Sequence, residues 1–476
     1  MSLAAFLSAT LFVGCNSDSE YVSEDASSNV AASAFAFQAD KKVMVGLDSV
    51  FFSIDLENAR IFNATPLPYG TSTKKLVADI QFVDIVQSVK LTVTRDNLPD
   101  TVYNYGENPT DSIDYTYPVK MEVVSYSGLT TRTYTITVNV SKEKSDSLSW
   151  DRTARRELPT TLSTPTAQKT VATSDGYYCL AGNNSAMTLS VAANPAGAWS
   201  TSQVNYGNAD LESFTAAGDK FYILRDKTLH TSADAKSWTT TGLSAESILG
   251  AYGDKVLYVA KNNNKYVVKE YPGDNEYEVP TGMPIFNTSQ LLPLDFAMAD
   301  SKQVIMMGGT TADRLTTSDV WGFDGKQWAC ITVNGIGKNL RNITLVPYYT
   351  FRTPNINTTY QYVCLLALGG TDGRNINRTV YTSVNYGMTW TEGGDLVQLP
   401  LYIPSFYGAQ AFVVDQTITE SRSNIWLEYM ASRATEPITD WQCPYIYLFG
   451  GYTADGSLSP YIWRGVINRF TVKPVQ

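Results

Sequence analysis

Residues 303–328 read QVIMMGGTTADRLTTSDVWGFDGKQW, and this stretch decides the fold of the chain. Its apolar run at 304–307 predicts an inner β-strand that is buried on both faces. The Gly-Gly pair at 308–309 predicts a turn that needs positive φ or leaves no room for a Cβ atom. A polar loop, a Val-Trp pair at 320–321 and a closing Trp328 follow. We therefore predict two antiparallel strands whose aromatic residues fill the space beside a neighbouring sheet.

The same order of features recurs twice further along the chain. Apolar runs lead into Gly-Gly pairs in YVCLLALGG (362–370) and YIYLFGG (445–451), and the units close on Trp390 and Phe470. Three matched units indicate a repeat architecture. They resemble the blades of a kelch-like β-propeller of the galactose-oxidase and kelch type. This resemblance implies an all-β propeller domain over residues 150–476.

Three weaker units precede these, which gives six predicted blades. Their strands are YYCLAG (177–182), FYILRD (221–226) and VLYVAK (256–261). The last blade can take its outer strand from residues 468–474 or from the segment around Trp150. We favour the Trp150 segment, because it would join the two ends of the ring.

Two segments carry a further turn motif. SVNYGMTW (383–390) and SADAKSW (232–238) resemble the Asp-box of sialidase-type propellers, with Asn385 and Asp234 in the acidic position. An Asx side chain that accepts hydrogen bonds from its own backbone stabilises such a turn, and the tryptophan packs it onto the blade. These boxes lie away from the catalytic centre in families that have them, so they favour a propeller and not an enzyme.

Residues 36–142 show a different pattern of short alternating strands. In TRTYTITVNV (131–140), Tyr134 and Ile136 alternate with threonines, which is typical of a strand with one buried face. Six or seven such segments predict an N-terminal β-sandwich of Ig-like or cadherin-like type. Residues 143–149, charged and serine-rich, predict a linker.

Residues 1–15 form an apolar leader that is too short to span a membrane as a helix. Its end, LFVGC, resembles a bacterial lipobox with Cys15 as the lipidated residue. Residues 16–35 are polar and acidic and predict a disordered tether. Acidic residues directly after such a cysteine resemble the export signal of Bacteroidota-type surface lipoproteins of unknown function. The resemblance implies a signal peptide and a lipid anchor on the outer face of the outer membrane.

Composition narrows the possible partners. A net charge of −10 argues against a nucleic-acid partner. Five cysteines without CxxC spacing and a single histidine, His230, predict no metal site and no cofactor. A Ser-His or Cys-His nucleophile would have to use His230 itself. Cys179 and Cys364 lie in apolar runs, where we favour buried thiols over a disulfide.

Two sets of side chains are candidate ligand-binding residues. One set lies in loops after the Gly-Gly pairs, which a repeat would place on the same rim: Arg314, Arg374 and Asn375. The other set comprises aromatic residues of a long insertion, which can stack on sugars or anchor a protein: Trp426, Tyr429 and Trp441. The alternative for these aromatic residues is simple packing of the insertion.

The sequence leads us to expect a non-catalytic, surface-anchored protein that binds a glycan or a protein partner through the propeller rim. We assign no catalytic residues, since the loop carboxylates are ordinary turn formers. One alternative is a carbohydrate-active hydrolase with two carboxylates in a deep central pocket. Another is a structural subunit of a cell-surface complex, which would present a flat apolar patch.

Overall fold

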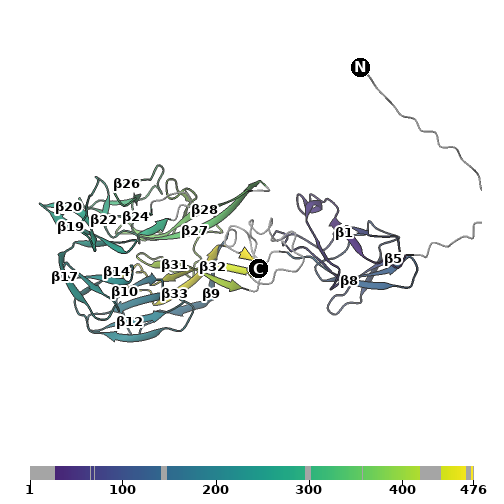
Figure 1. Ribbon diagram of the computed structural model, residues 1–476, viewed down its shortest axis with the longest axis horizontal. Helices are drawn as coiled ribbons and strands as arrows, with labels where there is room; N and C mark the ends of the chain where they lie inside the picture. Colours follow the sequence, from purple (N-terminus) through teal and green to yellow (C-terminus); the bar gives the residue numbers. More distant parts are fainter. Residues whose placement is uncertain are drawn as a thin grey trace, which may run out of the picture. The chain divides into compact units, whose positions relative to one another are not determined.

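The chain folds into β-sheets that form two compact units (Figure 1). The computed structural model describes residues 27–64, 66–68, 70–140, 147–294, 302–355, 358–418, 441–467 and 473–474. Within these residues the single helix is the short 3₁₀ turn η1 (Leu47–Ser49). The N-terminal unit comprises residues up to 63 together with 72–138, and the second unit comprises 64–71 and 139–476.

The N-terminal unit contains two sheets. The larger has the spatial order β2 (Ser53–Asp55), β3 (Arg60–Phe62), β8 (Thr131–Thr137), β7 (Val119–Ser125), β5 (Val86–Val93) and β6 (Thr101–Asn104). The smaller pairs β1 (Ala32–Phe37) with β4 (Ala78–Phe82). All of these pairs are antiparallel except β3 with β8, which run parallel.

One core holds the N-terminal unit together. In β8, Tyr134 and Ile136 are buried, as their alternation with threonines predicts. Phe37 packs edge to face on Phe52 and Tyr115, with ring centroids 5.2 and 5.1 Å apart. Such aromatic contacts add to the free energy gained from burying the rings.

The second unit contains six sheets among the residues that the structure describes. The first two sheets contain β10 (Ala167–Thr173), β11 (Gly176–Gly182), β12 (Met187–Ala192) and β13 (Ser200–Val204), and then β14 (Ala209–Ala217), β15 (Lys220–Arg225), β16 (Thr228–Ser232) and β17 (Thr239–Ser244). The third and fourth contain β18 (Ser247–Tyr252), β19 (Lys255–Asn262), β20 (Lys265–Tyr271) and β21 (Glu276–Glu278), and then β22 (Pro284–Phe286) and β23 (Leu292–Leu294) on β24 (Gln303–Thr311), followed by β25 (Thr316–Phe323) and β26 (Trp328–Cys330). The last two contain β27 (Arg341–Asn355), β28 (Thr358–Thr371), β29 (Tyr381–Ser383) and β30 (Thr391–Glu392), and then β31 (Gln410–Ile418), β32 (Trp441–Phe449), β33 (Tyr461–Ile467) and β9 (Leu148–Glu157), with β34 (Lys473–Pro474) on β32.

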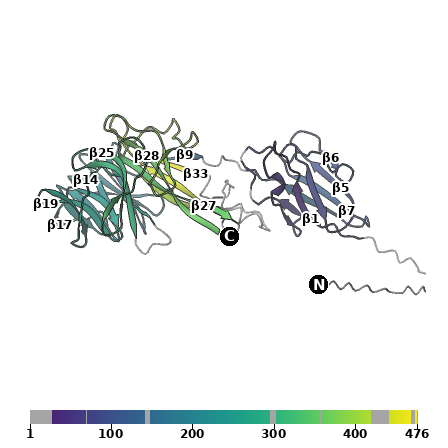
Figure 2. The same cartoon turned by 90° about the horizontal axis from the view of Figure 1, so that it is seen from above.

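These sheets follow one another in a closed ring. Strand β10 contacts β14, β14 contacts β18, β18 contacts β22, β24 contacts β27 and β27 contacts β31. Strand β31 of the last sheet contacts β10 of the first. The pair β27 and β28 forms a long hairpin, with register from Arg341 opposite Thr371 to Asn355 opposite Thr358 (Figure 2).

The apolar run at 304–307 is the second strand of its sheet, so the prediction that it is the inner strand is wrong. Alternate residues of β24 enter two different cores: Val304 and Met306 pack on one side, Ile305 and Met307 on the other. A neighbouring sheet covers each face, which explains the continuous run.

The Gly-Gly pair at 308–309 has the geometry that the sequence predicts. Gly308 has φ 67°, and a Cβ atom there would lie 2.6 Å from the carbonyl oxygen of Leu340. Gly309 has φ 131°, and its Cβ would lie 2.7 Å from the carbonyl oxygen of Phe286. Glycine is therefore required at both positions for conformational and steric reasons.

Both Asx turns are formed. The Asp234 carboxylate accepts hydrogen bonds from the backbone amides of Lys236 and Ser237 at 2.8 and 2.7 Å. Trp238 then stacks on Tyr206 at 5.6 Å. In the second turn, the Asn385 side-chain oxygen accepts hydrogen bonds from Ser383 Oγ and Thr389 N, both at 3.0 Å. The prediction of Asx-stabilised turns is confirmed.

The outer strand of the last sheet is β9, as we favoured. It pairs with β33 from Leu148 opposite Ile467 to Glu157 opposite Tyr461. Trp150 lies opposite Gly465, where a Cβ atom would approach the indole Cε3 to 2.7 Å. The first and last parts of the unit are thereby joined in one sheet.

We predict that Gly465→Ala lowers the free energy of unfolding of the second unit by about 1–3 kcal/mol, because the methyl group overpacks Trp150. In a Trp150→Ala background the same change should have little effect. Denaturant unfolding of the four proteins measures this coupling. Gly394→Ala, where a Cβ would meet nothing within 4 Å, is the control. An equal cost in both backgrounds would contradict the predicted contact.

We also predict that Asp234→Ala lowers the melting temperature at pH 7. The backbone amides of Ser237 and Lys236 lower the pKa of Asp234 from 3.8 to about 2. A lowered carboxylate pKa stabilises the fold above pH 3.8, and this contribution is lost as the pH falls toward 2. Melting curves should show the wild-type advantage shrinking over that interval. Asp313→Ala, in an exposed loop, should show no such narrowing.

Candidate functional site

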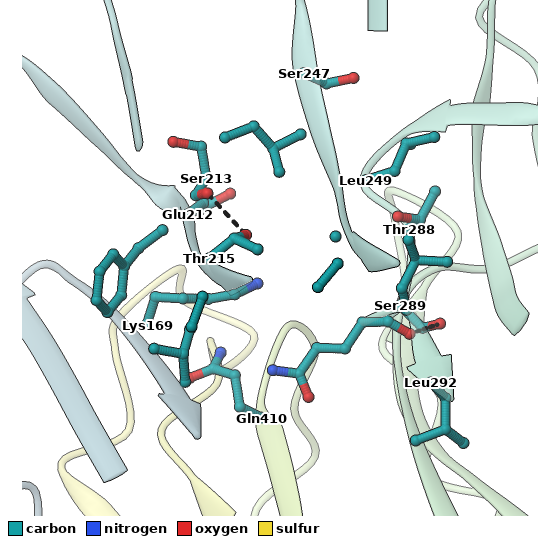
Figure 3. Close-up of a pocket in the computed structure, with 18 of the residues that line it drawn as sticks. Lys169, Glu212, Ser213, Thr215, Ser247, Leu249, Thr288, Ser289, Leu292 and Gln410 are labelled. Carbon is teal, nitrogen blue, oxygen red and sulfur yellow. Dashed lines mark hydrogen bonds between the residues drawn. The ribbon is translucent and has the colours of Figure 1, made fainter. Parts of the chain in front are cut away.

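The first strands of the six sheets surround a cavity of about 850 Å³, which we call the central cavity. Its wall is formed by β10, β14, β18, β22, β23, β27 and β31 together with adjoining loops. This volume lies in the range of pockets that enclose small-molecule ligands. The lining combines hydroxyl, amide and charged side chains with apolar ones such as Leu249 and Leu292 (Figure 3).

Four titratable side chains gather on one wall of the central cavity: Lys169, Asp210, Glu212 and Tyr452. Lys169 is on β10, the two carboxylates are on β14, and Tyr452 directly follows the Gly-Gly pair of β32. The backbone amide of Glu212 donates a hydrogen bond of 3.1 Å to Asp210 Oδ1. Figure 3 shows the amino end of Lys169 pointing into the space between the walls.

Burial sets the protonation behaviour of these groups. It lowers the pKa of Lys169, and the nearby carboxylates of Glu212 and Asp210 partly oppose this effect. Burial also raises the pKa of Asp210, and the charge of Glu212 raises it further. The pKa of Tyr452 is raised by burial and then by Glu212. The largest cause of all three shifts is the partial removal of the charged group from water, although Asp210 stays exposed to solvent through the cavity.

Other polar side chains of the central cavity hold its wall in place. Ser213 Oγ donates to the backbone oxygen of Asp210 at 2.6 Å and accepts from Leu224 N at 2.7 Å. The Gln410 side-chain oxygen accepts a hydrogen bond of 3.0 Å from Thr170 N. Because Gln410 is on β31 and Thr170 on β10, this bond links the last sheet to the first.

The residues predicted from the sequence lie elsewhere. Arg314, Arg374 and Asn375 are exposed in the loops that follow the Gly-Gly pairs and do not line the central cavity. The backbone amides of Arg374 and Asn375 both donate to Asp372 Oδ1 at 2.7 Å, which forms an Asx turn.

The remaining predicted residues are not tested by the geometry. Trp426, Tyr429 and the lipidation site Cys15 lie outside the described residues. Trp441 begins β32, and only its backbone is described.

The sequence reasoning missed Lys169, Asp210 and Glu212. A signal was present, since β10 (AQKTVAT) and β14 (ADLESFTAA) carry charged residues just before the apolar runs of β11 and β15. In a ring of sheets such polar first strands mark the surface of the cavity. The sequence pattern instead predicts apolar inner strands, which places the expected ligand contacts in the loops.

The surroundings of His230 bear on the Ser-His or Cys-His nucleophile considered above. His230 lies on β16, its ring packs edge to face on Tyr206 at 5.7 Å, and its Nδ1 is buried without a hydrogen-bond partner in the described part of the chain. Burial and the nearby guanidinium of Arg225 lower its pKa, so the neutral imidazole is favoured.

Family models match both units of the chain. Residues 144–475 match the DUF6242 beta propeller domain, and residues 21–138 match the DUF6242 N-terminal domain, a domain of unknown function. The chain belongs to the DUF6242 family. Its second unit is therefore a β-propeller.

Other comparisons add little to the DUF6242 assignment. None of the curated proteins matches the chain. A crystal structure of the tricorn protease is similar at 8% sequence identity and a TM-score of 0.28. The match covers 81% of this chain and 46% of the protease chain, so the DUF6242 protein spans less than half of that length.

The described residues hold no cluster of three or more His, Cys, Asp or Glu side chains placed to bind a metal ion. A search of the same residues for helices finds none with the length and apolar character needed to cross a bilayer.

We predict that Lys169→Met raises the free energy of unfolding by about 0.5–2 kcal/mol, because it removes a poorly solvated charge. A lowered lysine pKa destabilises the fold below that pKa, so this advantage should vanish as the pH rises toward 10.5. Denaturant unfolding at pH 7 and pH 10.5 tests both points. Lys265→Met, at an exposed hairpin, is the control, and a loss of stability at pH 7 would contradict the prediction.

Proposed function

We propose that this DUF6242 protein is a non-catalytic binding protein that encloses a small polar ligand, such as the end of a glycan, in the central cavity. The observation that carries the proposal is the cavity itself: about 850 Å³, with convergent polar side chains contributed by β10, β14, β18, β27, β31 and the loop between β22 and β23. Large concave sites with a few directed polar groups are the usual form of ligand sites. A flat protein partner would not reach these groups.

Loops near the cavity mouth extend this surface. The backbone of Gly309 packs on Phe286, that of Gly451 on Ala409, and both partners line the cavity wall. The loops after the Gly-Gly pairs therefore start beside the cavity, and in this proposal Arg314, Arg374 and Asn375 contact the outer part of a longer ligand. Trp426, Tyr429 and Trp441 would add aromatic contacts from the insertion.

The proposal includes a location and a finer fold type. According to this proposal, the protein is a Bacteroidota-type lipoprotein that is anchored through Cys15 on the outer face of the outer membrane. The N-terminal unit is an Ig-like sandwich that carries a six-bladed, kelch-like propeller. The lipobox-like leader and the repeated Gly-Gly strands support these points.

A second candidate is a carbohydrate-active hydrolase, because two carboxylates line the central cavity. Asp210 and Glu212 are two positions apart on β14, so both carboxylates come from one strand of the wall. Glycosidases place their carboxyl pairs about 5–9.5 Å apart. Burial and the Glu212 charge raise the pKa of Asp210, as a general acid requires. Turnover of aryl glycosides by the parent that is lost in Asp210→Asn would favour the hydrolase hypothesis.

A glycan-array screen of the protein without residues 1–20 tests the binding function. The parent should bind at least one class of glycan. Thr288→Trp places a large ring in the cavity wall and should abolish that binding by steric exclusion.

The matched control is Thr391→Trp on the exposed outer strand β30, which should bind like the parent. Melting curves establish that both variants fold. Binding that survives in Thr288→Trp and is lost in Trp426→Ala/Trp441→Ala would move the site from the cavity to the insertion. A parent that binds no glycan would contradict the proposal for the sugars on the array.

A further inference from the structure

Most hydroxyl groups of the central cavity are already engaged by the protein. Ser247 Oγ donates to the backbone oxygen of Ile285 at 2.5 Å. Ser289 Oγ donates to Gln290 O at 3.0 Å and accepts from Met307 N at 2.9 Å. With Ser213 bonded in the same way, these serines stabilise the wall and have little capacity left for a ligand.

Lys169 and Glu212 are different. In the described part of the chain, Lys169 Nζ makes neither a hydrogen bond nor an ion pair. The Glu212 carboxylate has no cationic partner within 4.0 Å there, and its neighbour in the wall is the Tyr452 hydroxyl. Glu212 nevertheless acts on Lys169, since its charge raises the pKa of Lys169 against the effect of burial. The cavity thus presents a cation and an anion side by side without a direct contact between them.

The two groups have opposite hydrogen-bonding needs. An ammonium group only donates, whereas an ionised carboxylate only accepts. A hydroxyl group does both. Two neighbouring hydroxyls on one ligand can therefore accept from Lys169 and donate to Glu212 at the same time. Charge-assisted hydrogen bonds of this kind are stronger than neutral ones.

We propose that the ligand of the central cavity is a neutral sugar, recognised through adjacent hydroxyls by Lys169 and Glu212. This inference rests on the binding function proposed above. An anionic ligand would meet the carboxylates of Asp210 and Glu212, and a cationic ligand would meet Lys169. A neutral polyol satisfies the pair and adds no further charge to the cavity.

The rest of the wall is also suited to an uncharged ligand. Thr288, Gln290 and Asn342 line it, and no hydrogen bond involving the side chains of these three residues is found within the described residues. Side-chain amides and hydroxyls donate and accept equally well, so they match sugar hydroxyls of either orientation. Glu246, the further carboxylate of the lining, is already paired with Lys227 at 2.9 Å.

Calorimetric titration of the glycans found on the array tests the inference, using the protein without residues 1–20. Neutral sugars should bind, and affinity should fall about tenfold or more in Lys169→Met and in Glu212→Gln, because each change removes one charge-assisted hydrogen bond. Lys265→Met and Glu278→Gln make the same changes of side chain at exposed positions and should leave affinity within about twofold of the parent. Melting curves confirm that the variants are folded.

The outcomes separate this inference from the binding function. Tighter binding of acidic glycans than of neutral ones, with affinity improved by Glu212→Gln, would overturn the neutral-sugar assignment and keep the cavity as the site. Binding that is abolished in Thr288→Trp but unchanged in Lys169→Met and Glu212→Gln would also overturn the neutral-sugar assignment and keep the cavity as the site. A parent that binds no glycan, or whose binding Thr288→Trp does not affect, would overturn both proposals.

Discussion

Closure of the ring of sheets is the constraint on which the propeller depends. Each sheet is apolar on both faces, and neither face is stable in water without a neighbour. In β15, Phe221 and Ile223 enter one core, while Tyr222 and Leu224 enter the next. Every sheet therefore needs two partners, and only a closed arrangement supplies them to all sheets. The contact of β31 with β10 provides the last of these interfaces, and the pairing of β9 with β33 joins the first and last strands of the unit in one sheet.

Ring closure also creates the central cavity. The first strands meet around a space that side chains do not fill, and water in this space can solvate polar groups on their inward-facing positions. Lys169 and Glu212 are tolerated there at a cost that the shifted pKa of Lys169 records. Lys169 makes no ion pair among the described residues, and charged groups with shifted pKa values often gather at functional sites. The scaffold is rigid around it, since Gln410 and Thr170 tie β31 to β10 beside Lys169.

Local features were well predicted because local forces determine them. Gly308 and Gly309 need their conformations whatever surrounds them, and the Asp234 and Asn385 turns bond within a few residues. The place of β24 within its sheet was predicted wrongly. A strand covered on both faces is apolar whether it is first or second in a sheet, so its composition does not reveal its order.

The sequence by itself determined the all-β class, the repeated strand units, the Asx turns and the favoured use of the Trp150 segment to close the ring. Each depends on residues close together in the chain or on a pattern repeated along it. Only the tertiary structure decided where the candidate site lies. Lys169, Glu212 and Tyr452 come from three different sheets, and they share one cavity wall because the ring closes. Their proximity depends on how the sheets pack, and no short-range pattern in the chain encodes it.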